Sequence, residues 1–285
     1  MLIEIKFETP FHSWGILHVF KKYFEYFQNE YSHLDIKYVD SRNFGDRFQG
    51  GVNSAHIMTI KNITNGKYLI VSYWDKIEDF FYVNNGWDVN NCVGIITSSG
   101  TKKNYHYIPF TYLPYTTDFE LFATNAKKME EKINNNLFFR GYIYDKRLEL
   151  KTIGLINISN EKVEPYENYF NELTNNKICL SLNGAGEICN RDIEILSARS
   201  VLLRPKLNTE FHNKLIPNYH YISFETDPNP KIQSEIIIDK FNEIKNNTEL
   251  LNFISDNGHK WFWENGTIDK NVEILKQLIN IDLLK

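Results

Sequence analysis

Two arginines follow an apolar segment whose composition predicts a β-strand. In the segment FFRGYIYDKR, the strand expected at Leu137 to Phe139 leads to Arg140 and then to Arg147. Ligands of open α/β sheets bind beyond the carboxyl ends of the strands, and a guanidinium group binds phosphate through two parallel hydrogen bonds. We therefore interpret Arg140 and Arg147 as anion-binding side chains, although a single arginine is more often an ordinary surface residue.

A second segment combines small residues with the expected start of a helix. In LSLNGAGEICNRDIEILSARSVLLRP, an apolar strand ends in a turn, and a helix begins near Arg191. Small side chains let backbone N–H groups approach a ligand, and the positive end of the helix dipole favours a diphosphate. The residues of this candidate binding turn are Asn183, Gly184, Ala185, Gly186, Glu187 and Arg191. A βα turn also uses glycine for its geometry alone, so both interpretations stay open.

The elements that must position these residues alternate between strands and helices. Apolar runs and alternation predict strands at Leu2 to Phe7, Ile36 to Val39, Tyr68 to Tyr73, Val93 to Thr97, Leu137 to Tyr142, Thr152 to Ile158, Ile178 to Leu182, Val201 to Leu203 and His220 to Phe224. Helical spacing predicts helices at Ile16 to Tyr31, Phe119 to Ile133, Tyr166 to Leu173, Arg191 to Arg199, Lys231 to Lys245, Glu249 to Trp263 and Lys270 to Leu278. We expect the strands at Ile36 to Val39, Tyr68 to Tyr73 and Val93 to Thr97 to be buried and parallel.

Length and prolines predict how these elements divide. A chain of 285 residues is long enough for two domains, and Pro109 and Pro114 indicate a crossing between them. We expect an α/β fold with domains at 1–115 and 116–285, each a Rossmann-type doubly wound unit, facing each other across a cleft. The last helix is expected to pack back on the first domain. The aromatic segment Trp261 to Trp263 is more typical of a core than of a stacking platform.

Charge and cysteine content exclude several classes of protein. The formal net charge of −4 gives no general attraction to nucleic acid. No stretch approaches 18 apolar residues, and the charged N-terminal segment does not have the pattern of a signal peptide, so we expect a soluble, cytoplasmic protein without a membrane span. The three cysteines have no metal-ligand spacing and are typical of reduced thiols. Abundant Asn, Lys, Ile, Tyr and Phe are typical of AT-rich genomes, such as those of large DNA viruses, phages and some bacteria.

Four segments in the second half together resemble a known family. They are FFRGYIYDKR, NELTNNKICLSLNGAGEICNRDIEILSARSVLLRP, LIPNYHYISFETD and TELLNFISDNGHKWFWENGTI. In order and spacing they resemble the donor half of the protein O-glucosyltransferase and capsule xylosyltransferase family, and more distantly the exostosin-type transferases. The resemblance covers roughly Leu137 to Ile279, whereas the first half resembles the family far less. Asn183, Glu187 and one extra residue before Arg191 depart from the family pattern.

The resemblance implies a fold and a chemistry. The fold is GT-B, and such enzymes usually need no divalent metal or other cofactor. Arg140 and Arg191 would hold the diphosphate of a UDP-sugar donor, with Arg147 near them, and the first domain would bind the acceptor. The implied reaction is transfer of xylose or glucose to a hydroxyl of a glycan acceptor, with inversion. If the source is a virus or a bacterium, for which the composition is typical, we expect the acceptor to belong to a surface glycan.

The base for such a transfer has two candidates. The fragment YLIVSYWDKIEDF resembles the strand whose terminal Asp is the catalytic base in protein O-glucosyltransferases, which would make Asp75 the base. Asp75 is almost equally well explained as the cap of a following helix. His12 is the rival, because its ordinary pKa lies near neutrality. Glu78 and Asp79 follow Asp75 too closely to form a separate metal site.

Two other functions stay open. A phage-type DNA base glycosyltransferase shares the GT-B architecture but requires a basic acceptor cleft, and the first half has only scattered Lys and Arg. A non-catalytic protein that binds a sugar or a nucleotide would keep the same pocket without turnover. The donor sugar, the acceptor, the linkage and the oligomeric state do not follow from the sequence.

Overall fold

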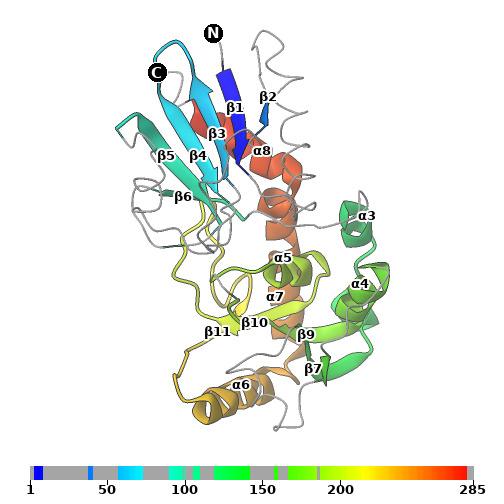
Figure 1. Cartoon of the computed structure of the whole chain (residues 1–285). Helices are drawn as coiled ribbons and strands as arrows, with labels where there is room; N and C mark the ends of the chain where they lie inside the picture. Colours follow the sequence, from blue (N-terminus) through cyan, green and yellow to red (C-terminus); the bar gives the residue numbers. More distant parts are fainter. Residues whose placement is uncertain are drawn as a thin grey trace.

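The computed structural model describes two β-sheets and the helices packed on them (Figure 1). The described residues are 3–8, 38–40, 57–72, 90–98, 100, 105–109, 119–141, 157–159, 166–184 and 187–280. Two sheets, the second with helices between its strands, confirm the predicted α/β fold class. The boundary predicted between residues 115 and 116 falls outside the described residues.

The first sheet lies at the top of Figure 1 and has six strands in the order β2-β1-β3-β4-β5-β6. The strands are β1 (Ile3–Glu8), β2 (Tyr38–Asp40), β3 (Ile57–Asn62), β4 (Tyr68–Ser72), β5 (Cys92–Thr97) and β6 (Tyr105–Tyr107). Strand β3 runs antiparallel to both β1 and β4, and the other neighbours are parallel. The strands predicted at Ile36 to Val39, Tyr68 to Tyr73 and Val93 to Thr97 therefore run parallel to one another, as expected, and the antiparallel strand β3 between them was not predicted.

A short turn explains the antiparallel pair. Only five residues separate Asn62 from Tyr68, and a parallel crossover needs a dozen or more, whereas a hairpin needs very few. Gly66 adopts a φ of 76°, which glycine reaches without strain. The side chain of Asn62 accepts a hydrogen bond from the Thr64 N–H at 3.0 Å. The Asn65-Gly66 pair thus closes a hairpin rather than ending a parallel strand.

The second sheet has five parallel strands in the order β11-β10-β9-β7-β8. They are β7 (Asn134–Arg140), β8 (Asn157–Ser159), β9 (Asn176–Leu180), β10 (Val201–Pro205) and β11 (Ile222–Phe224). After β7 the chain adds β8 on one side and then returns to add β9 on the other side. This reversal makes the gap between the carboxyl ends of β7 and β9 a topological switch point, where open α/β sheets bind ligands.

Helices cover both faces of the second sheet. They are α3 (Phe119–Thr124), α4 (Tyr166–Asn175), α5 (Asn190–Ser197), α6 (Pro230–Ile244), α7 (Thr248–Trp261) and α8 (Ile268–Leu278), with a 3-10 helix η2 (Met129–Glu131) and a π-helix η5 (Phe262–Gly266). Along β7, Leu137 and Phe139 pack in the core beneath α6, whereas Phe138 packs in the core with α4 and α5. Alternation along the strands therefore builds two cores, one on each face.

The helix predicted from Phe119 to Ile133 is shorter in the structure. Helix α3 ends at Thr124, and η2 follows as a separate turn. The side chains of Thr124 and Asn125 donate to the carbonyl oxygens of Glu120 and Leu121, at 2.8 Å and 3.1 Å. Such side-chain bonds compete with continued helical hydrogen bonding, which is why the polar segment does not extend the helix.

The end of the second half reaches the first half. In Figure 1, α8 lies behind the first sheet, and both chain ends lie at the top of the view. Asn271 of α8 donates to the Pro109 carbonyl oxygen at 3.4 Å, and the His212 N–H donates to the Tyr107 carbonyl oxygen at 2.9 Å.

Trp261 and Phe262 are 3% and 0% exposed, so these two aromatic rings belong to the core. No helix within the described ranges is long and apolar enough to cross a bilayer.

One buried lysine joins the ends of two helices. Lys132 is 4% exposed and donates to the carbonyl oxygens of Thr174 and Ala198 and to the hydroxyl of Ser200, at 2.7, 3.0 and 3.1 Å. Thr174 belongs to the last turn of α4, and Ala198 caps α5. Burial lowers the pKa of Lys132 to about 7. The lysine thus satisfies carbonyls that helix ends leave without partners.

We predict that Lys132→Met lowers the free energy of unfolding by about 2–5 kcal/mol, because two or more buried acceptors lose their donor. Urea denaturation followed by circular dichroism measures the change. Lys128→Met is the matched control, since Lys128 is exposed, and its effect should stay within about 0.5 kcal/mol. Equal stabilities of the two variants would contradict the role of Lys132.

Candidate functional site

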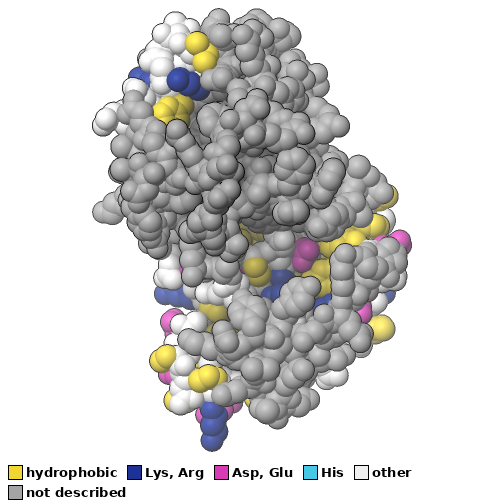
Figure 2. Space-filling model, in the orientation of Figure 1, with side chains coloured by type: hydrophobic (Ala, Val, Ile, Leu, Met, Phe, Trp, Pro, Cys, Tyr) yellow, Lys and Arg dark blue, Asp and Glu magenta, His cyan; other side chains and the backbone are white. Residues whose placement is uncertain are grey.

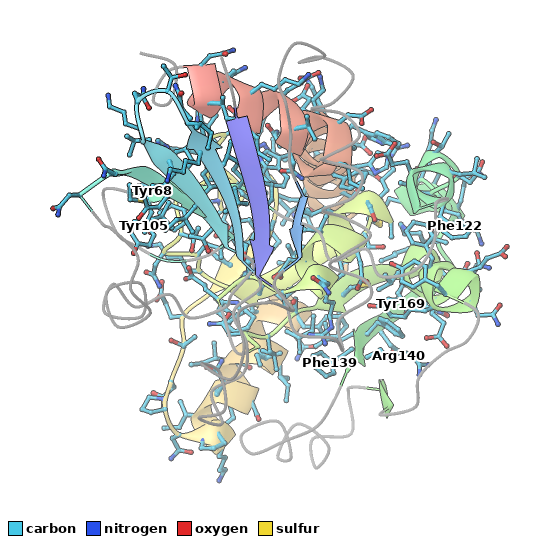
Figure 3. The ribbon with its side chains drawn as sticks, turned by 45° about the horizontal axis from the view of Figure 1, so that its top comes forward. Tyr68, Tyr105, Phe122, Phe139, Arg140 and Tyr169 are labelled. Atoms are coloured by element: carbon cyan, nitrogen blue, oxygen red, sulfur yellow. The ribbon has the colours of Figure 1, made fainter. Side chains whose placement is uncertain are left out.

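The candidate site lies at the carboxyl edge of the second sheet, at the switch point. Strand β7 ends at Arg140 and strand β9 ends at Leu180, and the turn after β9 leads into α5. Figure 3 shows Arg140 and Phe139 on β7 beside Tyr169 of α4, below the first sheet. Figure 2 shows acidic, basic and hydrophobic side chains together at the narrow level between the upper and lower parts of the molecule. The level between the two parts of the molecule therefore carries charged as well as hydrophobic side chains.

Arg191, in the first turn of α5, reaches across the switch point to β7. Its Nε donates to the Arg140 carbonyl oxygen at 2.8 Å, and its guanidinium carbon lies 4.5 Å from the centre of the Phe139 ring. A Cβ atom at position 141 would collide with Nη2 of Arg191, so Gly141 makes room for the guanidinium group. Nη1 of Arg191 is buried and makes no hydrogen bond within the described part of the chain. A buried donor without an acceptor costs free energy unless a ligand supplies one.

Arg140 has a different environment. Its Nε and Nη2 donate to the two carboxylate oxygens of Glu172 on α4, at 2.5 Å and 2.7 Å. The two side chains are 17% and 34% exposed. The guanidinium group of Arg140 therefore lies against α4, and its carbonyl oxygen, rather than its side chain, contacts Arg191.

A buried ion pair holds the turn after β9. Arg204 of β10 and Asp192 of α5 are each 1% exposed in their side chains, and Nη1 of Arg204 lies 2.8 Å from Oδ2 of Asp192. Nη2 of Arg204 also donates to the Asn183 side chain at 3.1 Å and to the Glu187 carbonyl oxygen at 2.8 Å. The Asp192 carboxylate accepts from the Cys189 N–H at 2.8 Å. One guanidinium group thus fixes both ends of the turn and the start of α5.

Glu187 binds the loop that follows β10. Its carboxylate accepts hydrogen bonds from the backbone N–H groups of Asn208 and Thr209, at 2.6 Å and 2.8 Å, and from the Thr209 hydroxyl at 2.6 Å. The same hydroxyl oxygen accepts from the Gly100 N–H at 3.0 Å, from the loop after β5 in the first half. Glu187 therefore connects the candidate binding turn to the first half through Thr209.

A buried carboxylate stabilises the packing of α4 against α5. Glu194 accepts hydrogen bonds from the hydroxyl groups of Tyr166 and Tyr169, at 3.1 Å and 3.0 Å. Burial raises the pKa of Glu194, while the two hydroxyl groups and nearby Arg191 oppose that rise. Burial and the Glu194 charge raise the pKa values of both tyrosines well above the ordinary value. The two tyrosines consequently stay protonated and act as donors.

The structure brings part of the predicted site together. Arg191 contacts Arg140, and the bonds of Arg204 place Asn183 and Glu187 beside the start of α5. Gly184 continues the same turn. The predicted residues His12, Asp75, Arg147, Ala185 and Gly186 lie outside the described residues.

The sequence reasoning missed Arg204, Asp192 and Glu172. Arg204 is the one charged residue of the strand VLLRP, all of which is buried. A charge inside a buried strand needs a partner, and the position of Arg204 in an apolar strand could have identified it from the sequence.

Among the described residues, no group of three or more His, Cys, Asp or Glu side chains is arranged to hold a metal ion.

Comparison with known proteins gives low similarities. No protein-family model and no curated protein sequence matches the chain. The chain is similar to S. aureus TarM in complex with Fondaparinux, alpha-GlcNAc-glycerol and UDP, with 11% identity and a TM-score of 0.34 over 79% of this chain and 64% of that chain. It is similar to the pneumococcal O-GlcNAc transferase GtfA in complex with UDP and GlcNAc, with 9% identity and a TM-score of 0.47 over 75% of this chain and 49% of that chain. It is also similar to WaaG, a glycosyltransferase involved in lipopolysaccharide biosynthesis, with 6% identity and a TM-score of 0.47 over 96% of this chain and 99% of that chain.

The chain thus spans less than two thirds of the length of the first two structures.

We predict that Arg204→Leu lowers the free energy of unfolding by about 3–5 kcal/mol, because Asp192 is left buried without a counter-charge. The double variant Arg204→Leu/Asp192→Asn should recover part of that loss, since it removes both charges. Urea denaturation of the two single variants and the double variant measures the coupling. Additive effects of the two substitutions would show that the ion pair does not hold the turn.

Proposed function

We propose that the chain is a glycosyltransferase that uses a nucleotide-sugar donor. The observation that carries this proposal is the position of Arg191 at the switch point, stacked on Phe139, with a buried Nη1 that makes no hydrogen bond within the described residues. The sequence resemblance of the second half supports the same activity.

The local charges favour a diphosphate at this edge. The N-terminus of α5 contributes a partial positive charge, and Arg191 lies in its first turn. The carboxylate of Asp192, the acidic residue of that turn, is paired with Arg204 and does not cancel the charge of Arg191. Glu187 is engaged by Asn208 and Thr209. A diphosphate would thus meet a fixed guanidinium donor and backbone N–H groups of the turn.

The proposed reaction has the diphosphate of the donor bound at Arg191. The oxygen of an acceptor hydroxyl forms a bond to the anomeric carbon of the sugar, while the bond from that carbon to the phosphate oxygen breaks. The bonding electrons go to the diphosphate, which Arg191 stabilises. The proton of the hydroxyl goes to a base, for which we propose Asp75, with His12 as the alternative.

The sequence resemblance supplies the finer part of the proposal. It supports UDP as the nucleotide, xylose or glucose as the sugar, a glycan hydroxyl as the acceptor, inversion at the anomeric carbon, and no metal requirement; for a virus or bacterium as the source, we propose a surface glycan as the acceptor. The resemblance implies that Arg140 also holds the diphosphate; because its side chain pairs with Glu172, we propose instead that it positions Arg191 through its carbonyl oxygen.

We predict that UDP raises the melting temperature of the protein by about 5 °C or more at about 100 times its Kd, because a ligand of the folded state stabilises it. The shift should persist in EDTA, and Arg191→Gln should remove most of it. Differential scanning fluorimetry measures these shifts.

Arg199→Gln is the matched control for the loss of a guanidinium group. Arg199 pairs with Asp256, whose side chain is 55% exposed. The control should keep the UDP shift. Equal shifts for the two variants, or no shift with any nucleotide or UDP-sugar, would rule out the proposed donor site.

A second prediction concerns Gly141. Gly141→Ala should weaken UDP binding about tenfold or more, because the added Cβ displaces the guanidinium group of Arg191. The double variant Gly141→Ala/Arg191→Gln should bind no more weakly than Arg191→Gln alone, since both changes act on one group. Isothermal titration calorimetry with UDP measures the three affinities. A further loss in the double variant would show that Gly141 acts independently of Arg191.

A further inference from the structure

A polar groove runs between β7 and α4. Its volume is about 400 Å³, within the range of small-molecule sites. Six asparagines line it, and we call it the asparagine groove: Asn134, Asn136, Asn168, Asn171, Asn175 and Asn176. Phe138, whose buried side chain lies on the α4 face of the sheet, gives the groove an apolar contact, and Leu137, Arg140 and Glu172 also line it.

The local sequence around this groove is unfavourable for the elements that it forms. Strand β7 begins with three consecutive asparagines, and α4 contains Asn168, Asn171 and Asn175 within ten residues. Asparagine is disfavoured in strands and is a weak helix former. What sets the groove apart is the convergence of these side chains, because six of the ten residues that line it are asparagines.

The groove offers hydrogen bonds but no net charge. Each asparagine amide has two donors and an acceptor oxygen. The charges of Arg140 and Glu172 satisfy each other through two hydrogen bonds. An anion or a cation would therefore gain little, whereas a neutral ligand with many hydroxyl groups would find donors and acceptors at close spacing.

Some asparagine side chains of the groove already make hydrogen bonds within the protein, and others are exposed to solvent. Asn176 donates to the Glu172 carbonyl oxygen at 2.7 Å, and Asn175 accepts from Lys127. Asn136 and Asn171 are exposed, and their amides make no hydrogen bond with the described residues. A ligand would thus meet fixed amides at the base of the groove and solvated ones at its rim.

We propose that the asparagine groove binds a neutral oligosaccharide, whose hydroxyl groups bond to the amides and whose C–H faces contact Phe138. The groove reaches Arg140, whose carbonyl oxygen accepts from Arg191, but its asparagine amides take no part in the proposed donor binding, and the proposal does not depend on the proposed transfer. In a glycosyltransferase it would hold a glycan at a distance from the reacting sugar.

The test uses saturation-transfer NMR and calorimetry on the whole chain with four neutral trisaccharides, namely maltotriose, cellotriose, xylotriose and chitotriose. Trigalacturonate serves as the acidic comparison. At least one neutral trisaccharide should bind, and it should bind more tightly than trigalacturonate. The variant Asn136→Leu/Asn171→Leu should weaken that binding about tenfold or more, through loss of two amides.

The matched control is Asn135→Leu/Asn246→Leu. Both control positions are exposed, and neither lines the groove, so this variant should bind the trisaccharide as the unmodified chain does. Circular dichroism confirms that both variants fold. No binding of any neutral trisaccharide at 10 mM, stronger binding of trigalacturonate, or equal loss in both variants would overturn the proposal. UDP titration of the same samples measures the proposed donor site separately. Absence of UDP binding would therefore not contradict oligosaccharide binding in the asparagine groove.

Discussion

The ion pair between Arg204 and Asp192 is the constraint on which the candidate site depends. It is buried on both sides, and breaking such a pair leaves an uncompensated charge in a medium that solvates it poorly. The pair fixes the start of α5, and the remaining donors of Arg204 fix the turn after β9. Because α5 is fixed, Arg191 in its first turn is held over the end of β7. The position of the guanidinium group that we propose for donor binding is therefore set by a different guanidinium group on the neighbouring strand.

Several parts of this arrangement follow from local sequence patterns. Apolar runs bounded by turns predicted β7, β9 and β10, and the small residues before Arg191 predicted the turn and α5. The rule that ligands bind at the carboxyl ends of parallel strands placed Arg140 and Arg191 at one edge, and the structure brings them into contact. These inferences succeed because strand ends and helix starts are local features.

Other parts depend on pairings between distant segments. The bond between Arg140 and Glu172 joins β7 to α4, and no spacing rule connects positions 32 residues apart. For the same reason, the sequence did not predict that Asp192 pairs with Arg204 on β10. The antiparallel course of β3 was missed although Asn65-Gly66 is a hairpin signal, because the strand before it was not recognised.

The hydroxyl group of Thr209 stands between the two halves, bound to Glu187 on one side and to Gly100 on the other. Breaking a neutral hydrogen bond such as that to Gly100 costs about 0.5–1.5 kcal/mol, whereas the bonds to the Glu187 carboxylate are charge-assisted and stronger. If the halves separate here, the bond to Gly100 yields first, and Thr209 stays with the turn after β9. A small movement between the halves at this point would therefore break the bond to Gly100 and leave the turn after β9 bound to Thr209.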